Sequence, residues 1–342
     1  MQTSVAKQER PLRLRVSNLS ITYKTPRGIL HAVRNASFEA WEKESLVFIG
    51  ESGCGKTTLC TSLVGMQPVN ATPIGGTVKY FGEDREYSIL EMSDKQLAKI
   101  RWKDIAMMFQ ASQNAFNPVI LMKEHFIDTA QSHLVGQSRK AILDKSRKLL
   151  ELVRLDADRV LNSYPHELSG GMKQRALLAL SFLLDPKVII FDEPTTALDV
   201  LTQRYIIDIL RDLRDKFSFC MLFITHDLSV AAELADTVVT MYAGQIVEKA
   251  PVGEIFSNPK HPYTAGLIQA VPTLSSTHED LKSIPGSTPD LVDMAAGCQF
   301  APRCKFATAL CLKEEPQLVE VGPNHVTACH HYEYIPPIVK KG

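Results

Sequence analysis

The sequence predicts an α/β fold, with one main domain and a smaller region appended to it. Short apolar runs alternate with helix-like segments over residues 188–241, the order expected of a parallel sheet covered by helices. A glycine-rich loop at residues 50–57 follows another apolar run and precedes a helix-like segment. The length of 342 residues is also long for a single domain, so an appended region is expected.

The N-terminal part of the chain predicts a β-rich subdomain. Residues 12–16, 37–40 and 46–49 are strand-like because they are rich in apolar and β-branched side chains. Residues 25–28 have the composition of a turn between the first two strands. We expect these strands to lead directly into the glycine-rich loop.

The middle of the chain predicts a helical insertion, at about residues 93–170. The sequence there is polar, and its apolar residues lie three or four positions apart over residues 141–153. After residue 169 the alternation of strands and helices resumes. The predicted strands are residues 188–191, 219–224 and 237–241, and the predicted helices lie near residues 203–215 and 228–234. The main domain is therefore predicted to span residues 1–255 and the appended region residues 256–342.

The glycine-rich loop fits the phosphate-binding motif G-x-x-x-x-G-K-[ST]. Glycines let backbone N–H groups turn inward around phosphate oxygens. Lys56 is then expected to reach the β- and γ-phosphates, and the Thr57 hydroxyl to bind Mg²⁺. An ordinary glycine turn is disfavoured because every fixed position and both flanks agree with the motif. The predicted nucleotide-binding residues are Gly50, Glu51, Ser52, Gly53, Cys54, Gly55, Lys56, Thr57 and Thr58.

Two carboxylates follow the buried apolar run at residues 188–191. They lie at the C-terminal end of a predicted parallel strand, where open α/β sheets bind ligands. Asp192 is expected to hold Mg²⁺, and Glu193 to polarise the attacking water as a general base. The alternative is a solvated acidic turn, which the phosphate loop upstream makes less favoured.

Composition limits the other classes of function. The chain has 38 basic and 38 acidic residues and a net charge of zero, which does not favour nucleic-acid binding. The first ten residues are polar and lack the apolar core of a signal peptide. No apolar run approaches the roughly 20 residues of a membrane-spanning helix. We therefore expect a soluble protein that reaches a membrane only through a partner.

The motif L-S-G-G-M-K-Q-R at residues 168–175 resembles the signature motif of the ATP-binding subunits of ABC transporters. The resemblance extends over about residues 12–252 and includes both phosphate-site motifs. In that family the signature motif completes the nucleotide site of the partner subunit. Ser169, Gly170 and Gly171 would then face a partner's γ-phosphate, because amides at a helix start form an anion site.

The resemblance implies roles for four more residues, each of which also has an ordinary structural explanation. Gln110 resembles the glutamine that contacts Mg²⁺ or water and couples to the membrane helices, although alone it would be a surface amide. His226 resembles the histidine that binds the γ-phosphate, although it could be a capping residue. Asp199 resembles an aspartate that links the two sites of the dimer, and it could also be a helix N-cap. Tyr23 lies where the family places a ring against adenine, or it is an exposed strand tyrosine.

Taken together, the expected catalytic residues are Glu193, His226, Gln110 and Lys56, and the expected Mg²⁺ ligands are Thr57, Gln110 and Asp192.

The C-terminal region resembles the extension of oligopeptide, dipeptide and nickel importers. The resemblance lies in H-P-Y-T-A-G-L at residues 261–267, A-V-P at residues 270–272 and Y-P-H-E at residues 164–167. Residues 283–289 are rich in Pro, Gly and Ser, so the extension is predicted to be irregular. Peptides are the expected cargo, with oligosaccharides and nickel as alternatives.

Four of the seven cysteines, Cys298, Cys304, Cys311 and Cys329, lie in this extension. Their spacing does not match the short C-x-x-C pairs of zinc ribbons or a ferredoxin run. The tail resembles that of peptide importers in which a cluster is expected, which implies that these cysteines bind a [4Fe–4S] cluster. Zinc and unligated thiols remain alternatives. His325 and His330 are further candidate ligands, although four sulfurs already satisfy a cluster.

The resemblance implies an ATP-driven subunit at the cytoplasmic face of the membrane. Its expected partners are a second ATP-binding subunit, identical or related, two transmembrane permease subunits and, indirectly, an external substrate-binding protein. The alternatives are an ABC ATPase without a transport role, which usually has long coiled-coil insertions or tandem cassettes, and a regulatory module that binds ATP without turnover. The chain has neither long coiled coils nor a second cassette, and its predicted catalytic residues are all present.

Overall fold

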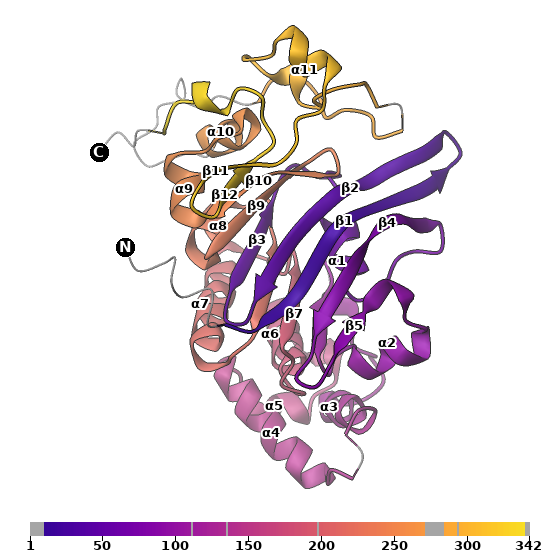
Figure 1. Ribbon diagram of the computed structural model, residues 1–342. Coiled ribbons are helices and arrows are strands. Elements are labelled where there is room, and N and C mark those ends of the chain that lie inside the picture. Colours follow the sequence, from indigo (N-terminus) through magenta and orange to yellow (C-terminus); the bar gives the residue numbers. More distant parts are fainter. Residues whose placement is uncertain are drawn as a thin grey trace.

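The structure is a computed structural model that describes residues 10–110, 112–134, 136–196, 198–270, 284–292 and 294–338. It contains two sheets with helices packed against them, so the predicted α/β fold class is confirmed (Figure 1). Among the described residues, no helix combines the length and the hydropathy needed to span a bilayer.

The first sheet is antiparallel and has the strand order β2-β1-β4-β5. Its strands are β1 (Leu12–Thr25), β2 (Gly28–Trp41), β4 (Ala71–Phe81) and β5 (Glu86–Ser88). The turn predicted at residues 25–28 joins β1 to β2, but both strands are longer than predicted. A register shift between Val16 and Leu19, with Asn18 in the left-handed region, breaks the alternation of buried residues in β1. That irregularity hides the second half of the strand from a period-two pattern.

The second sheet carries the phosphate loop and has the order β11-β12-β10-β9-β3-β8-β7-β6. The parallel strands are β6 (Ile105–Met108), β7 (Val188–Asp192), β8 (Cys220–Ile224), β3 (Ser45–Ile49) and β9 (Thr237–Tyr242). The antiparallel strands are β10 (Gln245–Pro251), β12 (His325–Thr327) and β11 (Val319–Gly322). All residues of the five parallel strands are buried, as expected for a sheet covered on both faces.

One face of this sheet packs against helices, and the other packs against the first sheet together with the helices at residues 56–62 and 94–100. The helices are α1 (Lys56–Ser62), α2 (Asp94–Ile100), α3 (Met122–Gln131), α4 (Arg139–Leu152), α5 (Ala157–Leu161), α6 (Gly170–Ser181), α7 (Val200–Lys216), α8 (Leu228–Leu234), α9 (Val252–Ser257), α10 (Pro262–Gln269) and α11 (Ala309–Lys313). Short 3₁₀ turns occupy Ile89–Glu91, Ser112–Asn114, Pro165–Glu167, Ala301–Arg303 and Tyr332–Tyr334. Helices α3, α4 and α5 form the narrow end of the molecule, opposite the C-terminal extension (Figure 1).

Two observed elements differ from the predicted domain boundaries. Strand β6 lies inside the range predicted as a helical insertion, because the apolar run Ile105–Met108 pairs with β7 at the edge of the main sheet. Strands β11 and β12 belong to the extension, yet β12 pairs with β10 and so continues the main sheet. The extension is therefore joined to the core by backbone hydrogen bonds as well as by the chain.

Candidate functional site: a nucleotide site at the ends of the parallel strands

The phosphate loop runs from the end of β3 to the start of α1, as predicted, and two of its glycines are required by its geometry. Gly50 has φ +148°, and a Cβ atom there would lie 2.3 Å from the carbonyl oxygen of Met241. Gly55 has φ +101°, and a Cβ atom there would lie 2.1 Å from the carbonyl oxygen of Ala32. Only glycine fits both positions, so the loop is a tight turn packed against neighbouring backbone.

The Lys56 ammonium group is folded against this loop. Its Nζ donates hydrogen bonds to the carbonyl oxygens of Gly50, at 2.7 Å, and Glu51, at 3.0 Å. Lys56 is buried. A buried cation beside the loop favours binding of an anion there. This position agrees with the predicted contact to nucleotide phosphates, which stays a prediction.

The predicted Mg²⁺ ligands Thr57 and Asp192 meet although 134 residues separate them in the chain. The Thr57 hydroxyl donates to Asp192 Oδ1 at 3.2 Å. Asp192 is buried at the end of β7, and burial raises the pKa of its carboxyl, while the Thr57 hydrogen bond opposes that rise. A hydroxyl and a carboxylate oxygen are hard donors that suit Mg²⁺, which would offset the cost of burying the charge. These donors therefore fit the ion chemically.

Three predicted catalytic residues converge at Glu193. Gln110 Nε2 donates to Glu193 Oε2 at 3.0 Å, and His226 Nδ1 lies 3.3 Å from Glu193 Oε1. Gln110 follows β6, Glu193 follows β7 and His226 follows β8, so adjacent parallel strands deliver all three to one edge of the sheet. The Thr196 hydroxyl also donates to Glu193 Oε2 at 3.0 Å, a contact that the sequence did not indicate.

The backbone of Glu193 is in an uncommon conformation. Its φ is +46°, in the left-handed region that non-glycine residues rarely occupy. The Glu193 N–H donates to the Ile224 carbonyl oxygen at 3.1 Å, which holds this conformation. Strain of this kind persists where surrounding structure enforces it, and it is common at functional sites. Here it turns the carboxylate out of the strand and toward Gln110 and His226.

The signature residues lie apart from the phosphate loop of the same chain. Ser169 is the N-cap of α6, and its hydroxyl accepts the Met172 N–H at 3.3 Å. Asp199 caps α7, as its alternative explanation predicted, by accepting the Thr202 N–H at 2.9 Å. An open cavity joins these two helix ends and is lined by Arg154, Ser169, Gly170, Gly171, Arg175, Leu198, Asp199, Leu201, Thr202 and Tyr205.

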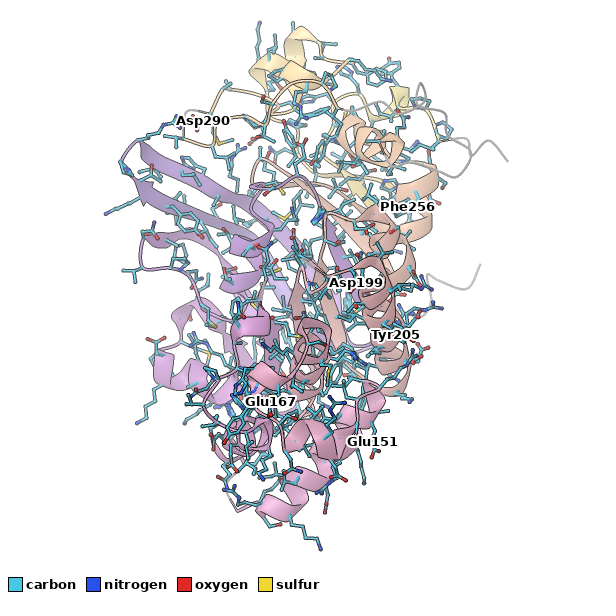
Figure 2. The ribbon with its side chains drawn as sticks, turned by 180° about the vertical axis from the view of Figure 1, so that it is seen from behind. Glu151, Glu167, Asp199, Tyr205, Phe256 and Asp290 are labelled. Atoms are coloured by element: carbon cyan, nitrogen blue, oxygen red, sulfur yellow. The ribbon has the colours of Figure 1, made fainter. Side chains whose placement is uncertain are left out.

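That cavity contains no residue of the phosphate loop, in the part of the chain that the structure describes. Figure 2 shows Asp199 and Tyr205 on the helical side of the molecule, away from the first sheet. The cavity at the signature is therefore separate from the phosphate loop of this chain.

Two further contacts connect the motifs. The Tyr23 hydroxyl lies 3.0 Å from the Thr58 hydroxyl, which places this tyrosine beside the phosphate-loop helix. Buried Gln174, in the signature helix, donates to the Pro194 carbonyl oxygen at 2.6 Å, directly after the two carboxylates. The sequence identified Gln174 only as a residue of the signature motif. It did not predict this contact, because helical spacing does not reveal which distant carbonyl group a side chain reaches.

The four cysteines of the extension line one apolar pocket. Cys298, Cys304, Cys311 and Cys329 lie around it together with His261, Pro262, Phe300, Ala301, Phe306, Pro316, His330 and His331. Burial, together with the neighbouring thiols, raises the pKa of the Cys329 thiol to about 12.

The predicted iron–sulfur site is not confirmed. Among the described residues, no three His, Cys, Asp or Glu side chains are grouped so that they could hold a metal ion. Candidate ligand His325 has another partner, because its Nε2 lies 2.7 Å from Glu248 Oε1.

Comparisons with known proteins agree with this geometry. Residues 33–196 match the family model described as ABC transporter, and residues 247–311 match the model of the oligopeptide/dipeptide transporter C-terminal region. The dipeptide transport ATP-binding protein DppD of Caldanaerobacter subterraneus is 42% identical over 320 residues, which cover 94% of this chain and 97% of that protein. The oligopeptide transport ATP-binding protein OppD of Escherichia coli K12 is 36% identical and covers 95% of each chain.

A solved structure supports the fold. The dimeric post-hydrolysis state of the ATP-binding cassette MJ0796, bound to ADP and Pi, is 25% identical with a TM-score of 0.61, and it covers 70% of this chain and 98% of that one. The chain belongs to the family of ABC transporter ATP-binding proteins, in the group with the oligopeptide/dipeptide transporter C-terminal region. It is an ATPase of the transport-coupled type, as the sequence predicted.

Proposed function

We propose that this chain hydrolyses ATP to drive an importer of dipeptides or oligopeptides. The observation that carries the catalytic part is the convergence of Gln110 and His226 on Glu193, beside the Thr57–Asp192 pair. Peptide cargo is supported by relatives named as dipeptide and oligopeptide transport proteins, which match almost their whole length. Substrate choice in such a system would reside in the permease and the external binding protein.

The roles of the site residues follow from their positions. Backbone N–H groups of the phosphate loop and Lys56 would bind the phosphates of ATP, and Thr57, Asp192 and Gln110 would hold Mg²⁺. Glu193 would orient and deprotonate the attacking water, with His226 next to it at the γ-phosphate. Ser169, Gly170 and Gly171 would close on the nucleotide of a second subunit. ATP then has higher affinity for the closed pair, and hydrolysis releases that pair.

The assembly we propose contains this chain, a second ATP-binding subunit and two permease subunits at the cytoplasmic face of the membrane. The open half-site around Ser169 supports a second subunit, because no phosphate-loop residue of this chain lines it among the described residues. The helices between β6 and α6 are short, the longest being the 14-residue α4, which disfavours a coiled-coil ABC ATPase without a transport role.

Transport by the assembled complex tests this function. The tagged chain, copurified with its partners and reconstituted in vesicles with the external binding protein, should drive ATP-dependent uptake of a labelled dipeptide or longer peptide. A maltooligosaccharide and Ni²⁺ serve as alternative cargoes under the same conditions. Uptake of either one, with no uptake of peptides, would contradict the peptide assignment and leave the ATPase assignment intact.

We also propose that the cysteine pocket can take up a [4Fe–4S] cluster. Two observations support this: four thiols line a single pocket, and thiolate sulfur is the ligand that iron–sulfur clusters require. The thiols would have to rearrange around the cluster, because the described residues contain no group placed to hold a metal ion. When bound, the cluster would replace part of the small hydrophobic core of the extension.

Iron and acid-labile sulfide should be measured after anaerobic purification of wild type and Cys304→Ser. We expect close to equal iron and sulfide in wild type and a large loss in the variant. Cys60→Ser is the matched control, since Cys60 is a buried thiol in α1 outside this pocket. Zinc without sulfide, or neither element in the wild type, would refute the cluster.

A further inference from the structure

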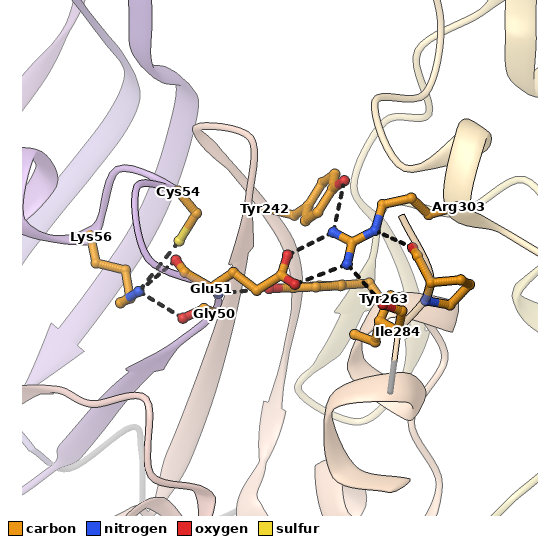
Figure 3. Close-up of polar contacts among 9 residues, drawn as sticks. Gly50, Glu51, Cys54, Lys56, Tyr242, Tyr263, Ile284 and Arg303 are labelled. Carbon is orange, nitrogen blue, oxygen red and sulfur yellow. Dashed lines mark hydrogen bonds and ion pairs between the residues drawn. The ribbon is translucent and has the colours of Figure 1, made fainter. Parts of the chain in front are cut away.

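The C-terminal extension contacts the phosphate loop directly, at a position that the motif leaves variable. Glu51 follows the first glycine of the loop, and its carboxylate points away from Lys56 toward the extension (Figure 3). There it forms a two-point ion pair with Arg303: Nη1 to Oε2 is 2.7 Å and Nη2 to Oε1 is 2.9 Å. Two residues 252 positions apart are thus joined in the fork geometry that arginine and carboxylate favour.

Arg303 is held firmly by the extension. Its side chain is only 4% exposed, and Nε donates to the Pro285 carbonyl oxygen at 2.8 Å. Nη1 also contacts the Tyr242 hydroxyl at 3.3 Å, and Nη2 contacts the Ile284 carbonyl oxygen at 3.5 Å. Together with the two bonds to Glu51, these contacts match the five N–H groups of a guanidinium. A group with all its donors engaged has little freedom, so it can fix the partner that it binds.

A second contact from the extension fixes the backbone of the same loop residue. The Glu51 N–H donates to the hydroxyl oxygen of Tyr263 at 2.7 Å. Tyr263 lies in α10 and is fully buried, and its ring packs against those of Tyr242 and Phe300, with centroids 4.6 Å and 5.5 Å away. The loop residue is therefore held at its side chain by Arg303 and at its peptide N–H by Tyr263, from two segments of the extension.

We propose that Arg303 and Tyr263 are positioning residues for the phosphate loop, which they hold through Glu51 in a shape ready for nucleotide. The inference rests on the proposed binding of ATP by this loop. The Lys56 ammonium group bonds to the Glu51 carbonyl oxygen, so a shift of Glu51 also moves the acceptor that orients Lys56. Without Arg303 the Glu51 carboxylate would be left unpaired next to the phosphate site, where its charge would repel the nucleotide.

Nucleotide affinity of the full-length chain tests the proposal without any partner protein. Calorimetry with Mg²⁺ and a nonhydrolysable ATP analogue should give a Kd about tenfold higher for Arg303→Gln than for wild type. Arg303→Lys keeps the positive charge but not the two-point geometry, so it should restore binding only in part. Tyr263→Phe should weaken binding by a smaller factor, roughly threefold, because it removes one neutral hydrogen bond.

A double-mutant cycle separates positioning from general stability. The double variant Glu51→Gln/Arg303→Gln should bind more tightly than Arg303→Gln alone, because it no longer has an unpaired carboxylate at the loop. Glu315→Gln is the matched control: Glu315 pairs with Arg34 and also joins the extension to the core, but among the described residues its carboxylate bonds to no residue of the phosphate loop. It should leave the Kd unchanged.

Three results would overturn the proposal, and each can be told from a failure of the proposed function. Wild-type affinity of Arg303→Gln for the analogue, with only its Tm lowered, would show a structural role. Wild-type affinity of Arg303→Lys would show that charge alone matters. Additive effects in the cycle would show that the pair does not act as a unit. Absence of binding by the wild type itself would instead contradict ATP binding by the loop.

Discussion

Residues that follow three adjacent strands meet at Glu193, whose own backbone is in the left-handed region. Its carboxylate accepts hydrogen bonds from Gln110 and Thr196 and lies beside His226. A carboxylate held in this way keeps one direction for its lone pairs, which a general base for a bound water requires. Neighbouring Asp192 contacts Thr57 instead, so the two adjacent acids have separate partners.

Replacing Glu193 tests whether it has a role separate from that of Asp192. Glu193→Gln should keep ATP affinity within about twofold of wild type and lower the ATPase rate of the complex by at least roughly 100-fold, because an amide cannot take up a proton. The ATP-bound pair of subunits should then persist in the closed form, which size-exclusion chromatography can detect.

Glu124→Gln is the matched control for that substitution. Glu124 lies on α3, where it pairs with Arg139, and the change should leave the ATPase rate unaltered. Full hydrolysis by Glu193→Gln would exclude Glu193 as the base.

Sequence motifs let individual residues be assigned to the candidate site because the chemistry of such a site fixes both residue type and spacing. This loop needs glycine where a Cβ atom would clash with Met241 or Ala32. The positions of Gly50 and Gly55 could therefore be recognised from the motif alone. The sequence could not show that Arg303 reaches Glu51, since nothing local identifies a partner 252 residues away. Glu51 was predicted only as a loop residue near the nucleotide.

At the scale of elements, a buried polar cluster joins β10, α10 and β12. Glu248 is fully buried, and its carboxylate accepts the His261 N–H at 3.1 Å and lies 2.7 Å from His325 Nε2. His261 Nδ1 in turn accepts the Tyr263 N–H at 3.1 Å, which starts α10. Burial lowers the pKa of His261 to about 4, with Glu248 opposing the shift. The ring is therefore neutral in the folded protein at neutral pH.

This cluster predicts a specific loss of stability in acid. The unfolded chain takes up a proton at His261 near pH 6.5, while the folded chain does so only near pH 4. Between these values the unfolded state binds more protons, so stability is full above pH 6.5 and falls toward pH 4, by up to about 3 kcal/mol.

Urea unfolding of wild type and His261→Asn at a series of pH values measures this contribution. Asparagine keeps an acceptor for the Tyr263 N–H but does not titrate, so the difference in free energy of unfolding between the two proteins should shrink or reverse as the pH falls. His166→Asn, at an exposed histidine, should follow the wild-type curve. A constant difference from pH 7 to pH 4 would contradict the assignment to His261.

Strands and helices with a regular pattern of apolar residues were predictable from the sequence. Strands with a register shift, or strands that form only by pairing with a distant segment, were not. The buried strands β7, β8 and β9 were placed within a residue or two because their residues are mostly apolar or β-branched. The second half of β1 was missed at its register shift. Strands β11 and β12 were missed because they are short and exposed in part, and they form by pairing with each other and, through β12, with distant β10.

At the scale of the whole molecule, one sheet both positions the candidate site and binds the extension to the core. Its parallel half delivers Gln110, Glu193 and His226 to one edge, while its antiparallel half continues into the extension through β12. Arg303 and Tyr263 therefore approach the phosphate loop from a region that is itself joined to the core sheet. The extension was predicted as an irregular appendage, and its contact with the nucleotide loop is the main property that composition could not reveal.

The largest-scale prediction concerns the half-site that this chain offers to another subunit. Ser169→Asp keeps a good N-cap for α6 but places a negative charge where the partner's γ-phosphate would bind. ATP affinity of the isolated chain should stay within about twofold, since its own phosphate loop is untouched, whereas the ATPase rate of the complex should fall at least about tenfold by charge repulsion. Ser138→Asp, the same change at the N-cap of α4, is the control and should alter neither quantity. If Ser169→Asp weakened nucleotide binding by the isolated chain and left hydrolysis by the complex intact, the signature would serve its own chain, and the division of each site between two subunits would be wrong.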